Sequence, residues 1–224
     1  MTERYQTRIQ QFIKEVTVYP VSCEQLCQGR SDREWLDGVL AGGARIVQLR
    51  DKVSEDRILY EKASYFRKRT KEAGALFIVN NRLDIALLTE ADGLHLGNSD
   101  IPAEEARRLA PDLIIGVSAN TPEQAASAEK RGASYFNIGP LFPTGTKKKL
   151  TAFLGIEAIA RFSALSPLPF TCMGGIKLEH VPELTKNGAR RLAVVTAISQ
   201  ATDITAETRK WIEAIKQGNP TTSP

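Results

Sequence analysis

The stretch of the chain best suited to chemistry is a short polar loop in its second half. Two hydroxyls, a glycine and a lysine follow one another in Thr144-Gly145-Thr146-Lys147. Hydroxyls and glycine N–H groups can surround phosphate oxygens, and a lysine adds positive charge without demanding fixed geometry. The loop follows residues 135–141, whose alternating apolar and polar character predicts a buried strand. Taken alone, the loop fits either an anion site or a solvated basic turn.

A second group of polar side chains stands near position 50. In an extended strand Gln48, Arg50 and Lys52 lie on one face, because side chains alternate with a period of two. An inward row of amide, guanidinium and ammonium groups is costly in a core unless it meets a charged ligand. Arg50 can hold a phosphate through two hydrogen bonds, and Lys52 can add a point charge. The alternative is a strand end whose cations pair with Asp51 or Asp56.

Other predicted strands also end in polar or flexible residues, among them Asn80-Asn81, Asp100, Ser118, Gly174-Gly175 and Thr196. Two anion sites follow from these positions. We expect a highly charged group such as pyrophosphate to be held by Gln48, Arg50, Lys52 and Lys147, with Mg²⁺ bound through oxygen atoms of Asp100 and Asn81. A monophosphate site is expected from Thr144, Thr146, Gly175 and Thr196, because barrels commonly bind phosphate after strands seven and eight.

Strand-like and helix-like stretches alternate along the whole chain and must position these residues. After an amphipathic helix over 1–14, the predicted strands cover 16–21, 45–50, 76–79, 93–97, 113–117, 135–141, 169–173 and 191–195. The predicted helices cover 31–40, 54–73, 83–88, 102–109, 122–131, 155–162, 178–187 and 204–216. Such alternation requires a parallel sheet.

Eight strand–helix units favour closure into a single (β/α)8 TIM barrel with an extra N-terminal helix. An open doubly wound sheet is the alternative, but the G-x-G-x-x-G fingerprint expected after its first strand is missing. We expect one barrel domain over residues 1–217. A disordered tail, rich in Pro, Thr and Ser, is expected over 218–224.

The composition of the chain limits the classes of partner that we expect it to bind. The net charge of +4 is mild and the basic residues are dispersed, which disfavours nucleic acid and favours phosphorylated small molecules. No apolar run approaches the roughly 18 residues of a membrane span, so no membrane partner is expected. The charged N-terminus does not look like a signal peptide, so we expect a cytoplasmic protein. A homo-oligomer is left open.

Together, seven stretches resemble the thiamine-phosphate synthase (thiamine-phosphate pyrophosphorylase) family over residues 15–215. They are residues 47–52, 77–82, 91–100, 116–121, 139–148, 174–176 and 196–199. The resemblance implies a TIM barrel that joins hydroxymethylpyrimidine pyrophosphate to a thiazole phosphate, with Mg²⁺ as cofactor. The products are thiamine phosphate and pyrophosphate, and the implied mechanism is dissociative.

The resemblance also implies roles for individual residues. Gln48, Arg50, Lys52, Asn80 and Lys147 would hold the pyrimidine pyrophosphate. Ser118 would lie beside the pyrimidine and leaving group, and Arg50, Lys52, Ser118 and Lys147 would form the catalytic set. The thiazole phosphate would be held by Thr144, Thr146, Gly175, Val195 and Thr196.

The chain departs from the family pattern near the metal. Asn81 stands where the family usually has an aspartate ligand of Mg²⁺, and Asp84 is a candidate to compensate. Asn98 and Asn120 replace a usual glutamine and histidine. These changes leave open a thiazole tautomerase-type paralogue, although the four residues Gln48, Arg50, Lys52 and Lys147 favour the synthase.

Two further alternatives come from other classes of protein. A non-catalytic, phosphate-binding regulatory barrel would keep the thiazole-phosphate residues alone. A phosphosugar isomerase would need a general acid and base, for which the strand ends offer mainly Asp51 and Asp100.

Overall fold

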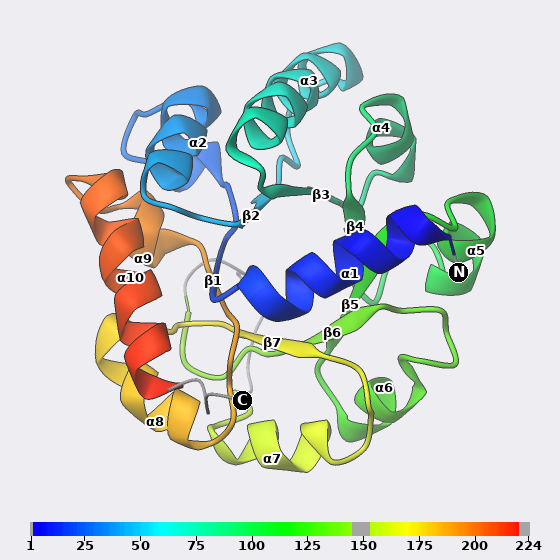
Figure 1. The fold of residues 1–224 in the computed structure, drawn as a ribbon, viewed down its shortest axis with the longest axis vertical. Coiled ribbons are helices and arrows are strands. Elements are labelled where there is room, and N and C mark those ends of the chain that lie inside the picture. The colour runs from blue at the N-terminus through cyan, green and yellow to red at the C-terminus, as the bar shows by residue number, and fades with distance from the viewer. Residues whose placement is uncertain (1, 145–152, 220–224) are drawn as a thin grey trace.

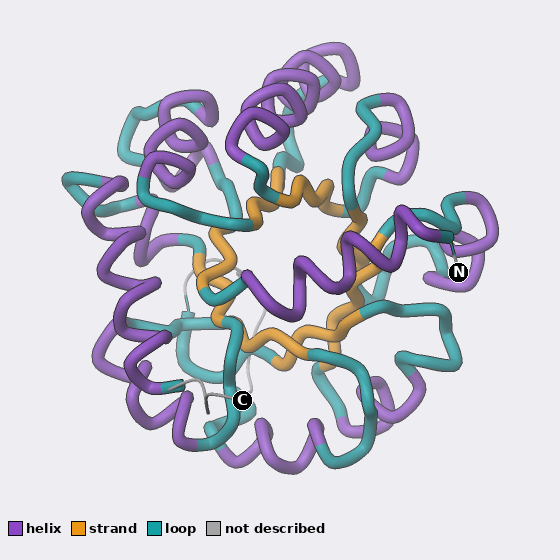
Figure 2. Tube along the Cα trace, in the orientation of Figure 1, coloured by secondary structure: helices purple, strands orange, loops and turns teal. Residues whose placement is uncertain are grey.

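Eight short parallel strands form one sheet that closes on itself. The structure is a computed structural model and describes residues 2–144 and 153–219. The strands are β1 (Val18–Pro20), β2 (Ile46–Leu49), β3 (Leu76–Asn80), β4 (Gly93–Leu96), β5 (Ile114–Ala119), β6 (Tyr135–Ile138), β7 (Phe170–Met173) and β8 (Leu192–Val194). Their order is β1-β8-β7-β6-β5-β4-β3-β2. A bridge between Val21 and Gln48 joins the two remaining edges, so the sheet is a barrel (Figure 2).

Helices surround this barrel, as Figure 1 shows. They are α1 (Glu3–Glu15), α2 (Asp32–Ala41), α3 (Asp56–Ala73), α4 (Leu83–Leu88), α5 (Ala103–Leu109), α6 (Pro122–Ser127), α7 (Glu157–Ser163), α8 (Val181–Lys186), α9 (Thr196–Ser199) and α10 (Ile204–Gly218). Two 3-10 turns are η1 (Glu24–Leu26) and η2 (Leu178–His180). The predicted (β/α)8 barrel with an extra N-terminal helix is confirmed. In the described part of the chain no helix is long and apolar enough to cross a membrane.

Local sequence signals set many of these helix ends. Ser31 and Thr121 each accept a hydrogen bond from the third helical residue, in capping boxes with Glu34 and Gln124. Gly74 ends α3 in the left-handed conformation, with φ of 61°. These signals lie within a few residues of each boundary, so sequence alone could locate them.

Alternation along the strands divides the core in two. Inward residues such as Ile46, Ile78, Ile114 and Tyr135 fill the barrel interior together with side chains of α1. Outward residues pack beneath the surrounding helices, as Val47 and its neighbours do. Period-two alternation therefore decides which residue at each strand end faces the inside of the barrel.

The helix α1 covers the amino-terminal end of the barrel (Figure 1). Its residues Tyr5, Ile9 and Phe12 are buried, and the Phe12 ring stacks on Tyr135 with centroids 4.6 Å apart. The Arg191 guanidinium donates to the carbonyl oxygen of Phe12, at 3.0 Å. This end of the barrel is thereby sealed, and only the opposite end is available to a ligand.

Several local predictions were wrong. The helix expected over 54–73 begins at Asp56 as α3, and the Ser54 hydroxyl donates to Asp51. The helix expected over 122–131 ends at Ser127, and the one over 178–187 divides into η2 and α8. Residues 196–199, which lie outside the predicted helices, form α9, because propensity says little about so short a helix.

The expected domain limits, 1–217 with a tail over 218–224, stay a prediction. The last helix continues through Gly218, and residues 220–224 lie outside the described residues.

Substitution of Phe12 by alanine should lower the free energy of unfolding by about 3–4 kcal/mol, because a fully buried ring would leave a cavity under α1. Urea unfolding followed by circular dichroism measures this loss. The matched control is Ile13→Ala on the same helix, where the side chain is 41% exposed, and we expect less than about 1 kcal/mol. Equal losses in both variants would mean that α1 does not seal the barrel.

Candidate active site

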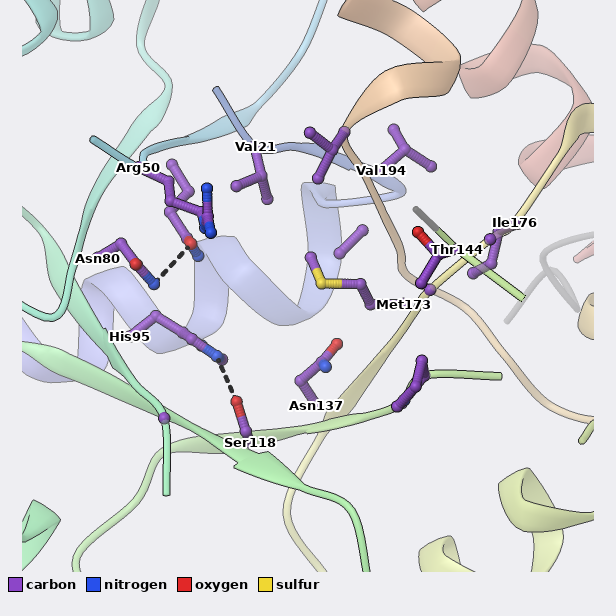
Figure 3. Close-up of a pocket in the computed structure, with 18 of the residues that line it drawn as sticks. Val21, Arg50, Asn80, His95, Ser118, Asn137, Thr144, Met173, Ile176 and Val194 are labelled. Carbon is purple, nitrogen blue, oxygen red and sulfur yellow. Dashed lines mark hydrogen bonds between the residues drawn. The ribbon is translucent and has the colours of Figure 1, made fainter. Parts of the chain in front are cut away.

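A cavity of about 1030 Å³ opens at the carboxyl ends of the strands. Its floor consists of the inward residues at or just past each strand end, shown in part in Figure 3: Val21, Gln48, Asn80, His95, Ser118, Asn137, Met173 and Val195. The loops after the strands form its walls. The closed parallel sheet brings these eight positions to one rim, although they span most of the chain.

Nearly all predicted site residues line this one cavity. The described ones are Gln48, Arg50, Lys52, Asn80, Asn81, Asp100, Ser118, Thr144, Gly175, Val195 and Thr196. Thr146 and Lys147 lie outside the described residues. The cavity has a cationic and amide side around β2 and β3, and a hydroxyl and glycine side around β7 and β8.

The cationic side rests on the loop after β1. The Arg50 backbone N–H donates to the Ser22 hydroxyl at 3.1 Å, and its guanidinium donates to the Cys23 sulfur at 3.6 Å. Because β2 ends at Leu49, Arg50 and Lys52 belong to the following loop rather than to one regular strand face. They still reach the cavity beside Gln48, so the expected grouping is found with different backbone geometry.

Asp51 does not neutralise these cations. It accepts hydrogen bonds from Val53, Ser54 and the Lys62 ammonium, the last at 2.8 Å. Burial disfavours the charged carboxylate, but the hydrogen bonds from Lys62 and Ser54 outweigh it, so the pKa of Asp51 lies well below its usual range. Asp56 pairs with Arg82. The alternative of a self-neutralised strand end is therefore wrong.

Lys62 also contacts Glu24 at 2.5 Å and Asp32 at 3.2 Å. The three carboxylates lie within 4.8 Å of one another, as oxygen ligands of a metal would. Burial raises the pKa of Asp32, and its longer contact with Lys62 offsets this only in part. Since an ammonium already occupies the centre of the group, it is an ion-paired cluster that anchors the loop carrying Lys52.

Asp100 and Asn81 meet at the rim between β3 and β4. The Asn81 amide donates to one oxygen of Asp100, and the Gly97 N–H donates to the other at 2.6 Å. Asn81 has φ of 66°, in the left-handed region that asparagine tolerates. Asp84 pairs with Arg82 at 2.6 Å and does not line the cavity, so it does not compensate for Asn81.

The opposite side is built by loops that pair through their backbones. The Phe142 N–H donates to the Gly174 carbonyl oxygen at 3.0 Å, which brings Thr144 beside the Gly174-Gly175 turn. A Cβ on Gly175 would lie 2.3 Å from the Pro143 carbonyl oxygen, so this close approach requires glycine. Thr196 begins the short helix α9. A phosphate site after strands seven and eight, often with a short extra helix, is common in such barrels.

Two inward residues received no role from sequence. Asn137 lies between Ser118 and Met173 on the cavity floor, and its amide oxygen accepts from Thr171 at 2.8 Å (Figure 3). His95 approaches Ser118, with Nε2 and Oγ 3.3 Å apart. The alternation that placed Gln48 would also have found Asn137, since it shares a strand face with Tyr135.

The fold and the cavity define a (β/α)8-barrel protein whose open end gathers cations, amides, hydroxyls and backbone N–H groups suited to anionic ligands. The chain belongs to the thiamine monophosphate synthase family, whose model matches residues 18–198. It is 40% identical to a thiamine-phosphate synthase of Pelotomaculum thermopropionicum, over 87% of this chain and 90% of the relative. It is 41% identical to that of Moorella thermoacetica, over 88% and 95%.

Solved structures agree with this assignment. The thiamine phosphate pyrophosphorylase of Pyrococcus furiosus superposes with a TM-score of 0.84 at 33% identity, covering 91% of this chain and 97% of that one. A 3-hexulose-6-phosphate synthase superposes with a TM-score of 0.63 at 17% identity, which reflects the shared barrel fold alone.

Substitution of Lys62 by methionine should destabilise the protein by about 3 kcal/mol at pH 7, because buried carboxylates would lose their counter-charge. Burial raises the pKa of Asp32, and loss of Lys62 removes the positive charge that partly offsets this rise. The loss should therefore shrink as the pH falls towards about 4. Urea unfolding at both pH values tests this. The exposed Lys68 on the same helix gives the control Lys68→Met, which should show neither effect.

Proposed function

We propose that the chain is a thiamine-phosphate synthase, which joins hydroxymethylpyrimidine pyrophosphate to a thiazole phosphate and releases pyrophosphate. One observation carries the proposal beside the family membership: a cationic side and a hydroxyl–glycine side face each other across one cavity. Two anionic reactants can thus be held with their uncharged parts meeting in the middle. Holding two reactants together in this way is a major source of rate enhancement.

The cationic side is assigned to the pyrimidine pyrophosphate. Gln48, Arg50, Lys52 and Asn80 would hold it, joined by Lys147 from the loop outside the described residues. Arg50 suits this role because its guanidinium is anchored at one edge by Cys23 and can donate from its remaining N–H groups. The other side is assigned to the thiazole phosphate, through Thr144, Gly175, Val195 and Thr196, together with Thr146.

Magnesium would belong to the rim beside the pyrophosphate. Mg²⁺ takes oxygen ligands, commonly one or two carboxylates together with substrate phosphates. Asp100 supplies a carboxylate at the cavity. Asn81 supplies an amide, whose oxygen can face a cation after rotation of the side chain. This donor set fits Mg²⁺, and the protein contributes only the single negative charge of Asp100 to it. Bound there, Mg²⁺ would neutralise the negative charge of the pyrophosphate.

The proposed reaction is dissociative. The bond between the pyrimidine methylene carbon and the pyrophosphate oxygen breaks, and its electron pair leaves with the oxygen. The thiazole nitrogen lone pair then forms the new carbon–nitrogen bond. Arg50, Lys52 and Lys147 stabilise the charge growing on the leaving group, which is electrostatic catalysis by preorganised donors. Ser118, at the cavity floor, would lie beside the pyrimidine.

The alternatives lack comparable support. A tautomerase-type paralogue or a non-catalytic barrel needs only the thiazole-phosphate side, and neither explains why Arg50 and Lys52 stand at the cavity without pairing with Asp51. Incubation of the purified protein with both precursors and Mg²⁺ separates the three functions. Equimolar thiamine phosphate and pyrophosphate are expected. Thiazole isomerisation without pyrophosphate would identify the paralogue, and no turnover would identify a binding protein.

Arg50→Ala should lower turnover by about 100-fold or more, because the leaving group loses a preorganised cation. The KM for thiazole phosphate should change less than about threefold. Steady-state kinetics with each substrate varied in turn tests this, and Arg57→Ala, on an exposed side chain of α3, is the control. Equal damage to both substrates would show that the two sides of the cavity are wrongly assigned.

Asp100→Asn should raise the Mg²⁺ concentration needed for half-maximal activity by about tenfold, since the site loses its carboxylate. EDTA should abolish turnover of the unmodified protein, and added Mg²⁺ should restore it. Asp84→Asn is the matched control, because Asp84 pairs with Arg82 outside the cavity. If Asp84→Asn instead raised the Mg²⁺ concentration needed for half-maximal activity, the metal would lie nearer α4.

A further inference from the structure

A continuous chain of hydrogen bonds crosses the inside of the barrel and joins two sides of the cavity floor. Asn80 Nδ2 donates to Gln48 Oε1 at 3.1 Å, and Gln48 Nε2 donates to the Tyr19 hydroxyl at 2.9 Å. The Tyr19 and Tyr135 hydroxyls are 3.0 Å apart, and the Tyr135 hydroxyl lies 3.2 Å from His95 Nδ1. His95 Nε2 then meets the Ser118 hydroxyl at 3.3 Å.

The middle of this hydrogen-bond chain is buried, whereas its two ends reach the cavity. Tyr19 and Tyr135 are 1% and 0% exposed, whereas Asn80 and Ser118 line the cavity and are half-buried. Tyr135 fits because β5 carries glycine opposite it: a Cβ on Gly116 would lie 2.1 Å from the tyrosine ring. Burial raises the pKa of both tyrosines, so each hydroxyl keeps its single hydrogen.

One hydrogen for each hydroxyl fixes the direction of the chain. Gln48 Nε2 can only donate, so Tyr19 is the acceptor in that bond. Within the described residues, the only other partner of the Tyr19 hydroxyl is Tyr135. Tyr19 must therefore donate to Tyr135, because the reverse would leave a buried hydroxyl hydrogen without an acceptor, which destabilises a fold.

The same accounting continues to Ser118. Tyr135 accepts from Tyr19, so its own hydrogen goes to His95 Nδ1. His95 is then neutral and carries its hydrogen on Nε2, from which it donates to the Ser118 oxygen. The Ser118 hydrogen is thereby directed to the cavity. At the other end Asn80 uses one of its two N–H donors towards Gln48, which fixes the orientation of its amide and leaves its oxygen and its second N–H for a ligand.

We propose that Tyr19 and Tyr135 are positioning residues, which fix Ser118 as a hydrogen-bond donor towards the bound substrate and fix the orientation of the Asn80 amide. Reversal of every hydrogen bond would require the Gln48 and Asn80 amides to rotate together. The hydrogen-bond chain therefore has two possible directions, and the one described here directs the Ser118 hydrogen to the cavity. The consequence for turnover rests on the proposed function, whereas the polarity itself does not.

The direction of the hydrogen bonds can be measured by NMR through the tautomer of His95, because the protein contains only two histidines. Long-range ¹H–¹⁵N spectra of the ¹⁵N-histidine-labelled protein at pH 7.5 distinguish the two tautomers. His180→Gln assigns the second signal. We expect His95 in the Nε2–H form in the unmodified protein and a mixture of tautomers in Tyr135→Phe. An Nδ1–H or doubly protonated His95 in the unmodified protein would overturn the proposal.

Kinetics then tests the consequence for turnover. Tyr135→Phe should lower turnover about tenfold with little change in the KM for thiazole phosphate. The melting temperature should fall by a few degrees, because the buried Tyr19 hydroxyl loses its acceptor. The control Tyr65→Phe also removes one tyrosine hydrogen bond, to Asp37 at 2.8 Å, but lies on α3 outside the barrel and should retain activity. If Tyr135 acts through Ser118, its effect should disappear in a Ser118→Ala background.

The outcomes separate the two proposals. Full additivity of Tyr135→Phe and Ser118→Ala would reduce Tyr135 to a packing role and overturn the inference. Absence of thiamine phosphate formation with the unmodified protein would overturn the proposed function, while the tautomer of His95 would still decide the polarity.

Discussion

The closure of a parallel sheet is the constraint on which the rest of this protein depends. When eight parallel strands close, their carboxyl ends meet at one rim, and every second side chain points into a shared interior. The interior has room for little besides those side chains and one plug. Here α1 covers the amino end with apolar residues and accepts hydrogen bonds from the buried Arg191, whereas the polar residues that line the cavity lie at the carboxyl end. The molecule therefore has one face at which its polar inward residues can reach a ligand.

Polar groups at that face are tolerated because they satisfy one another. Gln48, buried to 3% exposure, is held between Asn80 and Tyr19, and His95 between Tyr135 and Ser118. A buried polar group without a partner destabilises the fold, whereas a closed network adds rigidity and fixes donor and acceptor directions. The same side chains thus solve a packing problem and present oriented groups to the cavity. Stability and recognition are coupled in this layer.

The loops above the rim follow a different rule. Arg50 and Lys52 follow the end of a strand. The acidic residue between them, Asp51, pairs with Lys62 in the ion-paired cluster. On the opposite side, Gly175 lets two loops approach within backbone contact distance. Cations are thereby left to face the cavity while their acidic neighbour is engaged elsewhere. This separation of charge suits a site for anionic ligands better than composition alone would suggest.

The strand–helix alternation, several helix caps and the polar residues near each strand end could be predicted from the sequence, because these depend on neighbours within a few residues. The barrel was favoured by the count of eight strand–helix units along the chain. It also carried the family resemblance that the comparisons confirmed. Which distant groups meet was settled only by the tertiary structure: Tyr19 with Tyr135, Asp51 with Lys62, and Asp56 with Arg82. A period of two specifies the face on which a side chain lies. It does not specify the partner, since that depends on strand register and loop path across the closed barrel.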